Sequence, residues 1–214
     1  MLTVHHLNVS QSERIVWLLE ELDLPYELRV YQRDPVTQFA PVELREVHPL
    51  GSAPVLCDGE IVIAESGAII EYVLARYGNG RLAPPVTSLH YPDYLYWFHY
   101  ANGSLMMQIS VNWIAQMPAE PGSDSPLLSS LQERLDRHLQ MVEDHLSSVT
   151  YFAGTEFTAA DIMMHFPFGT MKAFYNVGLD NRKNILAWLT RISDRRSYQR
   201  AMKVAGHEQD PALG

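Results

Sequence analysis

Two serines stand just ahead of the first helical pattern in the chain. Ser10 and Ser12 lie in the polar stretch NVSQS, and the next residues, ERIVWLLEEL, have helical periodicity. A hydroxyl group at the N-terminus of a helix can donate a hydrogen bond to an anion, and the helix dipole favours negative charge at the same end. The same serines can instead cap the helix, a role that suits Ser12 in particular. The segment therefore predicts an anion-stabilising hydroxyl group, a helix cap, or both.

A second polar pair, Glu65 and Ser66, separates a strand-like run from another helical pattern. Ser66 is expected to be the N-cap of that helix, with an acidic neighbour that the helix dipole favours. These features also suit anion binding, because an N-cap lies beside the unpaired N–H groups of the first turn. At the other end of the same stretch, SAPVLCDGEIVIAES, Pro54 by itself indicates only the start of a strand.

The residues between these positions predict a small α/β domain. A strand is expected over residues 2–7, and the alternation from Tyr26 to Val30 is typical of a second, half-buried strand. Between them lies a helix whose core-facing positions are Ile15, Leu18, Leu19 and Leu22. A strand, a helix and a strand in close succession favour a right-handed parallel βαβ unit.

A hairpin and a helix complete this domain. A short helix is expected over residues 42–47, and the runs VLC and IVIA are separated by Asp58-Gly59, a two-residue turn signal. The helix that follows ends at Gly78 and carries on one face Ile70, Val73, Leu74 and Tyr77. This order of elements is that of a thioredoxin-like fold, which we assign to residues 1–80.

The composition changes after residue 80. The stretch GNGRLAPPVTS is rich in Gly, Pro and Ser, which is typical of a linker, and we assign the linker to residues 81–88. Residues 89–214 show no convincing strand pattern. An aromatic- and Met-rich helix is expected over residues 89–117, ending near Pro118 before the loop AEPGSDSP. Further helices are indicated by the amphipathic spacing between Leu131 and Leu146, by FTAADIMMHF and by the apolar positions from Ile185 to Ile192. The second half is therefore predicted to be an all-α domain.

Thr158 and Asp161 have the [ST]-x-x-[DE] spacing of a capping box, for which we predict a structural role. The nine histidines show no persuasive metal-ligand spacing, so no metal is expected. His138 and His145, seven residues apart on one helix, are expected to face solvent. Cys57 lies within the hairpin and is not assigned as a nucleophile.

The bulk composition narrows the class of protein. The chain has 214 residues, 47% of them hydrophobic and 19% charged, which is ordinary for a globular protein. A formal charge of −9 argues against nucleic-acid binding, which needs clustered Lys and Arg. No apolar run approaches the ~18 residues needed to cross a bilayer, and the start of the chain does not resemble a signal peptide. A single cysteine fits a reducing compartment, so a cytoplasmic location is expected.

The whole pattern resembles the soluble glutathione S-transferase family, in which a thioredoxin-like domain precedes an all-helical domain. The resemblance rests on SQSER leading into IVWLLEELDLPYE, on HPLGSAPVL followed by the Glu-Ser pair, and on AGTEFTAAD in the second half. The order and spacing of these three segments make the match specific. The first segment is similar to bacterial and fungal subgroups that use a serine in place of a tyrosine.

The resemblance implies that glutathione is bound and that its thiol is ionised. Ser10 matches the hydroxyl donor of the serine-type members, while Ser12 is favoured as a cap. Asn8 is the second candidate for this role, because it stands near the place of the tyrosine in tyrosine-type members and its amide can donate to a thiolate.

The resemblance also assigns residues to the rest of glutathione. The bond before Pro54 is cis in the family, and the backbone of Ala53 pairs with the cysteinyl part of the tripeptide. Glu65 and Ser66 match the pair that holds the γ-glutamyl group. Ser52 departs from the lysine or glutamine that many members carry near this position for the glycyl carboxylate. His48, Gln38 and Arg33 are the alternatives for that contact.

The resemblance places an electrophile pocket in the helical domain. Met106, Met107 and Trp113 offer adaptable apolar surface for a hydrophobic electrophile, although each fits helix packing or a dimer interface equally well. Asn102 replaces an acidic residue that the family often carries. The implied activity is detoxification: the glutathione thiolate attacks an electrophilic small molecule, with reduction of organic hydroperoxides as a related activity.

Two other functions compete with this one. A non-catalytic binding or regulatory protein of the same fold is the main alternative, which Ser52 and Asn102 keep open. A glutathione-dependent isomerase fits less well, because the paired serine-cysteine motif of that subgroup is absent. The resemblance further implies a homodimer in which each domain packs against the opposite domain of the other chain.

Overall fold

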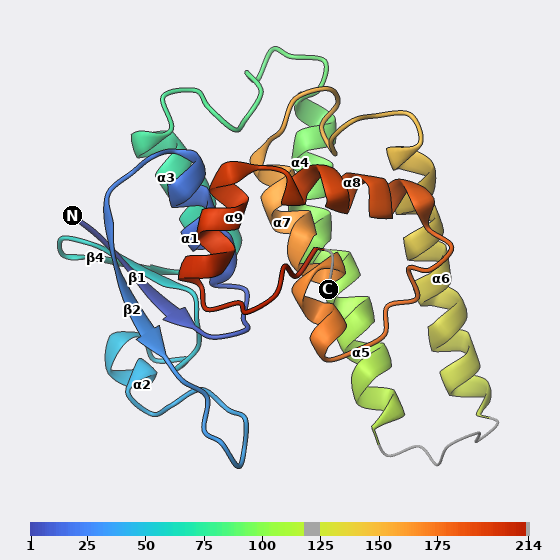
Figure 1. Cartoon of the computed structure of the whole chain (residues 1–214), viewed down its shortest axis with the longest axis horizontal. Helices are drawn as coiled ribbons and strands as arrows, with labels where there is room; N and C mark the ends of the chain where they lie inside the picture. Colours follow the sequence, from blue (N-terminus) through green and yellow to red (C-terminus); the bar gives the residue numbers. More distant parts are fainter. Residues whose placement is uncertain (118–124, 213–214) are drawn as a thin grey trace. The chain divides into compact units, whose positions relative to one another are not determined.

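The computed structural model describes residues 1–117 and 125–212. The expected helix end at Pro118 and most of the loop AEPGSDSP lie outside the described residues. The chain divides into two compact units, the first formed by residues 1–85 together with 192–214 and the second by residues 86–191 (Figure 1). Among the described residues, no helix combines the length and the apolar character that a membrane span requires.

The first unit is built on a four-stranded mixed sheet. Its strands are β1 (Leu2–Leu7), β2 (Tyr26–Tyr31), β3 (Val55–Asp58) and β4 (Ile61–Ala64), in the order β2-β1-β3-β4. β1 pairs in parallel with β2 and antiparallel with β3, and β3 pairs antiparallel with β4. The predicted βαβ unit and hairpin are therefore confirmed, and so is the thioredoxin-like fold class.

Two longer helices and one short one accompany these strands, the third of them following β4. They are α1 (Glu13–Glu21), α2 (Leu44–Val47) and α3 (Ser66–Tyr77). The predicted core-facing residues of α1 are all fully or almost fully buried, because its apolar stripe faces the interior: Ile15, Leu18, Leu19 and Leu22. α2 is shorter than the expected helix over residues 42–47.

The hairpin turn and the start of α3 each differ from expectation by one residue. Asp58 pairs with Ile61, so the two loop residues are Gly59 and Glu60 rather than Asp58-Gly59, and Gly59 takes the positive φ of +61°. Asp58 stays in the strand, and its carboxylate accepts hydrogen bonds from the tyrosine hydroxyl groups of Tyr72 and Tyr77 on α3. The N-cap position of α3 is Glu65, and Ser66 is the first helical residue.

The C-terminal helix α9 (Arg196–Val204) belongs to the first unit, whereas the sequence assigned all residues from 89 to 214 to one helical domain. The helix packs against α1, beside which it lies in Figure 1. The indole of Trp17 meets the ring of Tyr198 edge-on, with centroids 5.0 Å apart. Arg195 forms a two-armed hydrogen bond to the Glu21 carboxylate, with both distances 2.8 Å. Tyr198 on α9 and Arg195 just before it therefore both contact residues of α1.

The second unit is helical, as predicted. Its elements are α4 (Tyr91–Tyr100), the π-helical segment η1 (Ala101–Met106), α5 (Met107–Gln116), α6 (Pro126–Leu146), α7 (Ala159–Phe168), the 3₁₀ segment η2 (Thr170–Ala173) and α8 (Lys183–Ser193), which continues two residues past the unit boundary. The long expected helix over residues 89–117 is interrupted by η1, which begins at the ANGS stretch. π-helical segments are rare and often mark functional sites.

The N-terminus of α7 carries the predicted capping box. Thr158 and Asp161 each bond the other's backbone, and the Asp161 carboxylate also accepts hydrogen bonds from the backbone N–H of Phe152 and the indole N–H of Trp188, both at 3.0 Å. Burial raises the pKa of Asp161 to about 6, against the effect of these donors. Thr158 and Asp161 therefore tie the start of α7 to a loop and to α8.

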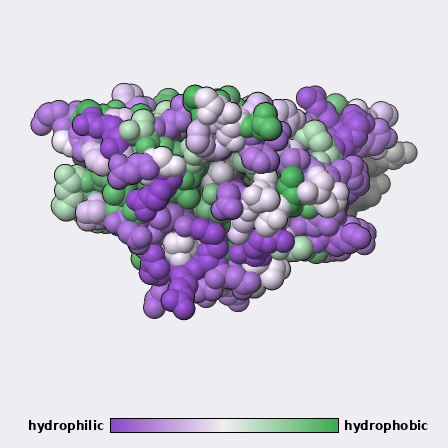
Figure 2. All heavy atoms as spheres, turned by 90° about the horizontal axis from the view of Figure 1, so that it is seen from above, coloured by the Kyte–Doolittle hydropathy of each residue, from purple (hydrophilic) through white to green (hydrophobic). Residues whose placement is uncertain are grey.

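The surface is mixed in character on the face drawn in Figure 2, where hydrophilic residues in purple are interspersed with white and green ones. Scattered exposed apolar residues are normal for folded proteins, since more than half of their accessible surface comes from apolar atoms.

Candidate active site

The loop between β1 and α1 brings the two serine hydroxyl groups together. Ser10 is buried with 8% of its surface exposed, and its Oγ lies 2.7 Å from Oγ of Ser12. The backbone N–H of Ser12 donates to Oγ of Ser10 at 3.2 Å. Ser12 occupies the N-cap position of α1, yet its side chain makes no cap hydrogen bond to the helix. The expected capping role of Ser12 is therefore wrong, because its hydroxyl is used elsewhere.

The Ser12 hydroxyl bonds to β1 instead. Its Oγ lies 2.8 Å from Nδ1 of His6 and accepts the backbone N–H of Leu7 at 3.1 Å. The other ring nitrogen of His6, Nε2, lies 3.0 Å from the carbonyl oxygen of Ala205, just after α9. His6 is fully buried, and burial lowers its pKa below the ordinary value. Ser10, Ser12, His6 and Ala205 therefore form one continuous hydrogen-bonded chain.

Asn8 and Arg33 define the outer part of the loop. The Asn8 amide donates to Oε1 of Gln32 at 3.1 Å, while its Oδ1 is buried without a hydrogen-bond partner. Arg33 donates to the carbonyl oxygens of Asn8 at 3.2 Å and Val9 at 2.9 Å. Its third contact, at 3.0 Å, is with the carbonyl oxygen of Gln38. The guanidinium group thus holds the loop backbone and uses three of its five N–H donors for these contacts.

The residues expected to bind the remainder of glutathione lie at the ends of β3 and β4. The Ala53–Pro54 peptide is cis, as the resemblance implied, and it directly precedes β3. Glu65 is exposed and has φ of +72°, an uncommon conformation for a residue other than glycine. Such conformations cluster at functional sites, where the surrounding structure holds them. Ser66 is buried in the first turn of α3, whose N-terminal N–H groups can bind an anion.

The candidates for the glycyl carboxylate are dispersed. Ser52 is exposed, and His48 is half-buried with its Nδ1 3.5 Å from the backbone nitrogen of Leu50. Gln38 is exposed at a positive φ of +60°, and its amide donates to the carbonyl oxygen of Pro35 within the same turn. These local contacts do not decide which of Ser52, His48 and Gln38 meets the carboxylate, so this assignment stays a prediction.

The expected electrophile-binding residues do not share one environment. Met106 is buried, Met107 on the next helical position is 61% exposed, and Trp113 is half-buried with its ring 6.1 Å from that of Phe174. Consecutive helical residues point about 100° apart, which explains the contrast between the two methionines. None of the three lines the cavity beside Tyr96 and His138 in this unit.

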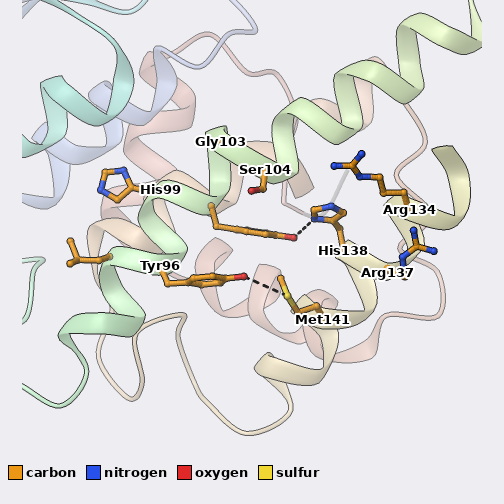
Figure 3. A pocket seen from close by; sticks show the side chains of 10 residues that line it. Tyr96, His99, Gly103, Ser104, Arg134, Arg137, His138 and Met141 are labelled. Atoms are coloured by element: carbon orange, nitrogen blue, oxygen red, sulfur yellow. Dashed lines mark hydrogen bonds between the residues drawn. The ribbon is translucent and has the colours of Figure 1, made fainter. Parts of the chain in front are cut away.

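That cavity has a volume of about 870 Å³ and lies along α4, η1 and α6. Figure 3 shows aromatic, methionine and basic side chains around it. Tyr96 stacks on Tyr100 with ring centroids 5.5 Å apart, and the hydroxyl of Tyr100 bonds to Nδ1 of His138. Arg134 and Arg137 line its α6 side. Sequence reasoning missed this cavity, because it took His138 for a solvent-facing residue.

The expectation that His138 and His145 face solvent is wrong, whereas the structure agrees with leaving Cys57 unassigned as a nucleophile. His138 and His145 are half-buried and hydrogen-bonded rather than solvated; Nε2 of His145 lies 2.9 Å from the carbonyl oxygen of Phe152. Burial raises the pKa of the Cys57 thiol in β3, which disfavours a reactive thiolate there. Across residues 1–117 and 125–212, no group of three or more His, Cys, Asp or Glu side chains is arranged to hold a metal ion.

The fold and the site together define a class of protein. Its members combine a thioredoxin-like unit, which has a cis-proline before one strand, with a helical unit. The family models for the N-terminal and C-terminal domains of glutathione S-transferase match residues 2–75 and 104–196. Glutathione S-transferase 3 of Schizosaccharomyces pombe is 35% identical over 210 residues, covering 91% of this chain and 84% of that protein. For glutathione S-transferase 1 of Saccharomyces cerevisiae the identity is 28% over 233 residues, with coverage of 100% and 97%.

A solved structure agrees with these sequence matches. A glutathione S-transferase from Actinobacillus pleuropneumoniae superposes with a TM-score of 0.86 at 31% identity, covering 100% of this chain and 99% of that one. The chain belongs to the glutathione S-transferase family. It is therefore a glutathione transferase, an enzyme of a family that uses glutathione as its co-substrate.

Proposed function

We propose that Ser10 donates the hydrogen bond that stabilises the glutathione thiolate. The supporting observation is the position of its Oγ at the N-terminal end of α1, where the hydroxyl and the helix dipole act on the same atom. A free cysteine thiol has a pKa of about 8.5. Lowering it by about two units requires ~2.7 kcal/mol of preferential thiolate stabilisation. Asn8 is the weaker candidate, because one of its two amide N–H groups already bonds Gln32.

The proposed binding mode runs from β3 to α3. The backbone of Ala53, before the cis bond to Pro54, pairs with the cysteinyl part of glutathione like one more strand. Glu65 pairs with the γ-glutamyl ammonium group, and Ser66 with the first N–H groups of α3 receives its carboxylate. Arg33 positions the Ser10 loop instead of meeting the glycyl carboxylate, which leaves Ser52, His48 and Gln38 for that contact.

The proposed reaction is attack of the thiolate on an electrophilic carbon of a hydrophobic small molecule, with displacement of a leaving group or addition to a double bond. Positioning supplies much of the rate, since a bound nucleophile acts at high effective concentration. Reduction of organic hydroperoxides by the same thiolate is the accompanying activity. Met106, Met107 and Trp113 are proposed to contact the electrophile, and Trp113→Ala should raise KM for the electrophile while leaving KM for glutathione unchanged.

One experiment tests the assignment of the thiol-activating group. Wild type, Ser10→Ala and Asn8→Ala are applied to immobilised glutathione and then assayed with a chlorinated nitroaromatic and with cumene hydroperoxide. We expect all three to bind, Ser10→Ala to lose most turnover of both substrates, and Asn8→Ala to keep it. Loss of activity in Asn8→Ala alone would transfer the role to Asn8.

The subgroup, the assembly and the location are further proposals. Ser10 supports the serine-type subgroup that occurs in bacteria and fungi. A homodimer, as is usual in the family, is supported by the exposed apolar residues on α4 and α6, Leu95, Tyr96 and Met141. Sedimentation of wild type should give twice the chain mass, and Tyr96→Asp should shift the protein toward monomer. The cytoplasmic location is tested by cell fractionation.

A further inference from the structure

The buried chain that leads inward from Ser10 has a defined direction. The carbonyl oxygen of Ala205 can only accept a hydrogen bond, so Nε2 of His6 carries the proton at their 3.0 Å contact. Nδ1 of neutral His6 is then an acceptor, and the nearby Ser12 hydroxyl donates to it at 2.8 Å. The Ser12 proton has a second acceptor within reach, the carbonyl oxygen of Leu7 at 3.3 Å, and we assign it to the closer one, Nδ1 of His6. Oγ of Ser12 therefore accepts from Ser10 at 2.7 Å, as it does from the N–H of Leu7.

This direction decides what Ser10 offers to an incoming thiol. With its own proton turned toward Ser12, Oγ of Ser10 receives the N–H of Ser12 and keeps one lone pair available. That lone pair can accept the S–H of glutathione. If Ser10 is to donate to a thiolate, the hydrogen bonds of this series must run the other way. The Ser12 hydroxyl then donates to Ser10, and the Ser10 hydroxyl donates to the thiolate.

We propose that His6 is the terminal proton acceptor of a relay that ionises glutathione through Ser10 and Ser12. The inference rests on the proposed role of Ser10. The S–H bond breaks as its proton passes to Oγ of Ser10, the Ser10 proton passes to Oγ of Ser12, and the Ser12 proton passes to Nδ1 of His6. The net change is a thiolate at one end of the chain and an imidazolium at the other.

The relay leaves every bond of the chain in place. After transfer, the imidazolium donates to Ser12, Ser12 donates to Ser10, and Ser10 donates to the thiolate, while the N–H groups of Leu7 and Ser12 keep their acceptors. The Nε2–H of His6 still donates to Ala205. Reversal of the chain therefore creates the Ser10 hydrogen bond that stabilises the thiolate.

The surroundings of His6 suit a resting acceptor. His6 is fully buried, which lowers its pKa and keeps it neutral before glutathione binds. The charged or titratable groups that act on it are Glu13, which favours the imidazolium, and His207, which opposes it. Nε2 of His207 lies 2.9 Å from a carboxylate oxygen of Glu13, and both side chains are largely buried.

The protonation state of His6 is the direct readout. The protein is labelled in its histidine rings, and the His6 signal is assigned by its loss in His6→Gln. At neutral pH we expect neutral His6 without ligand, imidazolium with glutathione, and neutral His6 with S-methylglutathione, which has no thiol proton. A His6 signal that stays neutral with glutathione bound overturns the relay.

Two substitutions separate a relay from simple packing. His6→Gln keeps an N–H donor for the carbonyl oxygen of Ala205, and His6→Asn keeps an oxygen acceptor near the place of Nδ1. Neither side chain can take up a proton. We expect both variants to raise the pKa of bound glutathione by about one unit, a roughly tenfold change in its ionisation equilibrium, as followed by thiolate absorbance. Full recovery of the thiol pKa by His6→Asn contradicts proton uptake and leaves only an orienting role.

Ser10→Ala distinguishes this proposal from the proposed function. It should raise the thiol pKa and keep His6 neutral with glutathione bound. An unchanged thiol pKa in Ser10→Ala refutes the assigned role of Ser10, and the relay with it. A raised thiol pKa in Ser10→Ala, combined with a neutral His6 in wild type, refutes the relay alone.

Discussion

The N-termini of α1 and α7 begin with the same kind of residue and use it differently. Ser12 and Thr158 both occupy the N-cap position, and both are buried. Thr158 exchanges hydrogen bonds with Asp161 at the third helical position, where α1 has Ile15. Lacking that acidic partner, Ser12 bonds to His6 on β1 and makes no cap bond. A hydroxyl that does not cap its helix is available for chemistry.

The two helices are consequently held in different ways. The capping box fixes the start of α7 from within its own sequence and extends to Phe152 and Trp188. α1 is held by contacts with a distant segment, since Trp17 packs on Tyr198 and Glu21 binds Arg195. A local cap leaves no freedom for its hydroxyl, whereas tertiary anchoring leaves the start of α1 free for a functional network.

The largest effect is expected from Asp161→Asn. Each carboxylate oxygen accepts two donors, so one pair must face the new amide NH₂ group. The Thr158 hydroxyl can turn to accept from this amide, but the Thr158 N–H loses its acceptor, and we expect a loss of about 3 kcal/mol in the free energy of unfolding. Urea denaturation measures it, with the exposed Asp180→Asn as the matched control. Equal stability of the two variants would mean that the Asp161 network does not anchor α7.

Ser10→Ala should give a different pattern, a large loss of activity with a smaller loss of stability. We expect kcat/KM to fall about 100-fold, equivalent to ~2.7 kcal/mol of transition-state stabilisation. The free energy of unfolding should fall by about 1–2 kcal/mol, since Oγ of Ser10 both bonds the Ser12 hydroxyl and accepts the buried N–H of Ser12. Steady-state kinetics and urea denaturation are compared on the same samples. Destabilisation with retained kcat/KM would assign Ser10 a structural role like that of Thr158.

Arg195→Ala tests the tertiary anchoring of α1. Removing the guanidinium leaves the Glu21 carboxylate buried, and we expect a loss of about 2 kcal/mol, reduced from the value for a fully buried pair because Arg195 is partly exposed. Burial alone raises the pKa of Glu21, but hydrogen bonds from Arg195, Ser197 and Trp17 lower it in the balance.

The stabilisation by Arg195 therefore depends on pH in a defined direction. A carboxyl group whose pKa is lowered by folding contributes stability above its unfolded pKa, and this contribution is lost as the pH falls through the folded value. Stability curves of wild type and Arg195→Ala should thus differ most at neutral pH and converge below about pH 4. A constant difference down to pH 3 would show that packing, not charge, is responsible.

The smallest effect is expected from Thr158→Ala, which removes one side of the capping box. A loss of about 1 kcal/mol is typical for an N-cap threonine. Turnover at low temperature should stay at the wild-type level, because α7 holds no residue assigned to glutathione. Thr158→Ser, which keeps the hydroxyl, should restore most of the stability. Unchanged melting of Thr158→Ala would contradict the structural role that both the sequence and the geometry support.

Local patterns allowed much of the fold to be predicted. The stripe of α1, the parallel β1–β2 pair and the capping box were all readable, because each depends on residues close together in the sequence. The turn after β3 was misplaced by one residue, since Asp58 is kept in the strand by hydroxyl groups of α3 that no local signal announces. Helix α9 was missed, although Tyr198, Ala201, Met202 and Ala205 have helical spacing and are buried.

The sequence by itself determined the family, because the Ser10 segment, the Ala53-Pro54 segment and the Glu65-Ser66 pair stand in a recognisable order. It also predicts which residues stabilise an anion. Only the tertiary structure decided how the hydroxyl groups are used. The direction of the Ser10–Ser12–His6 chain depends on the Ala205 carbonyl, 199 residues from His6. A carbonyl oxygen can only accept a hydrogen bond, so Ala205 fixes which nitrogen of neutral His6 carries the proton, and folding alone brings that carbonyl to the site.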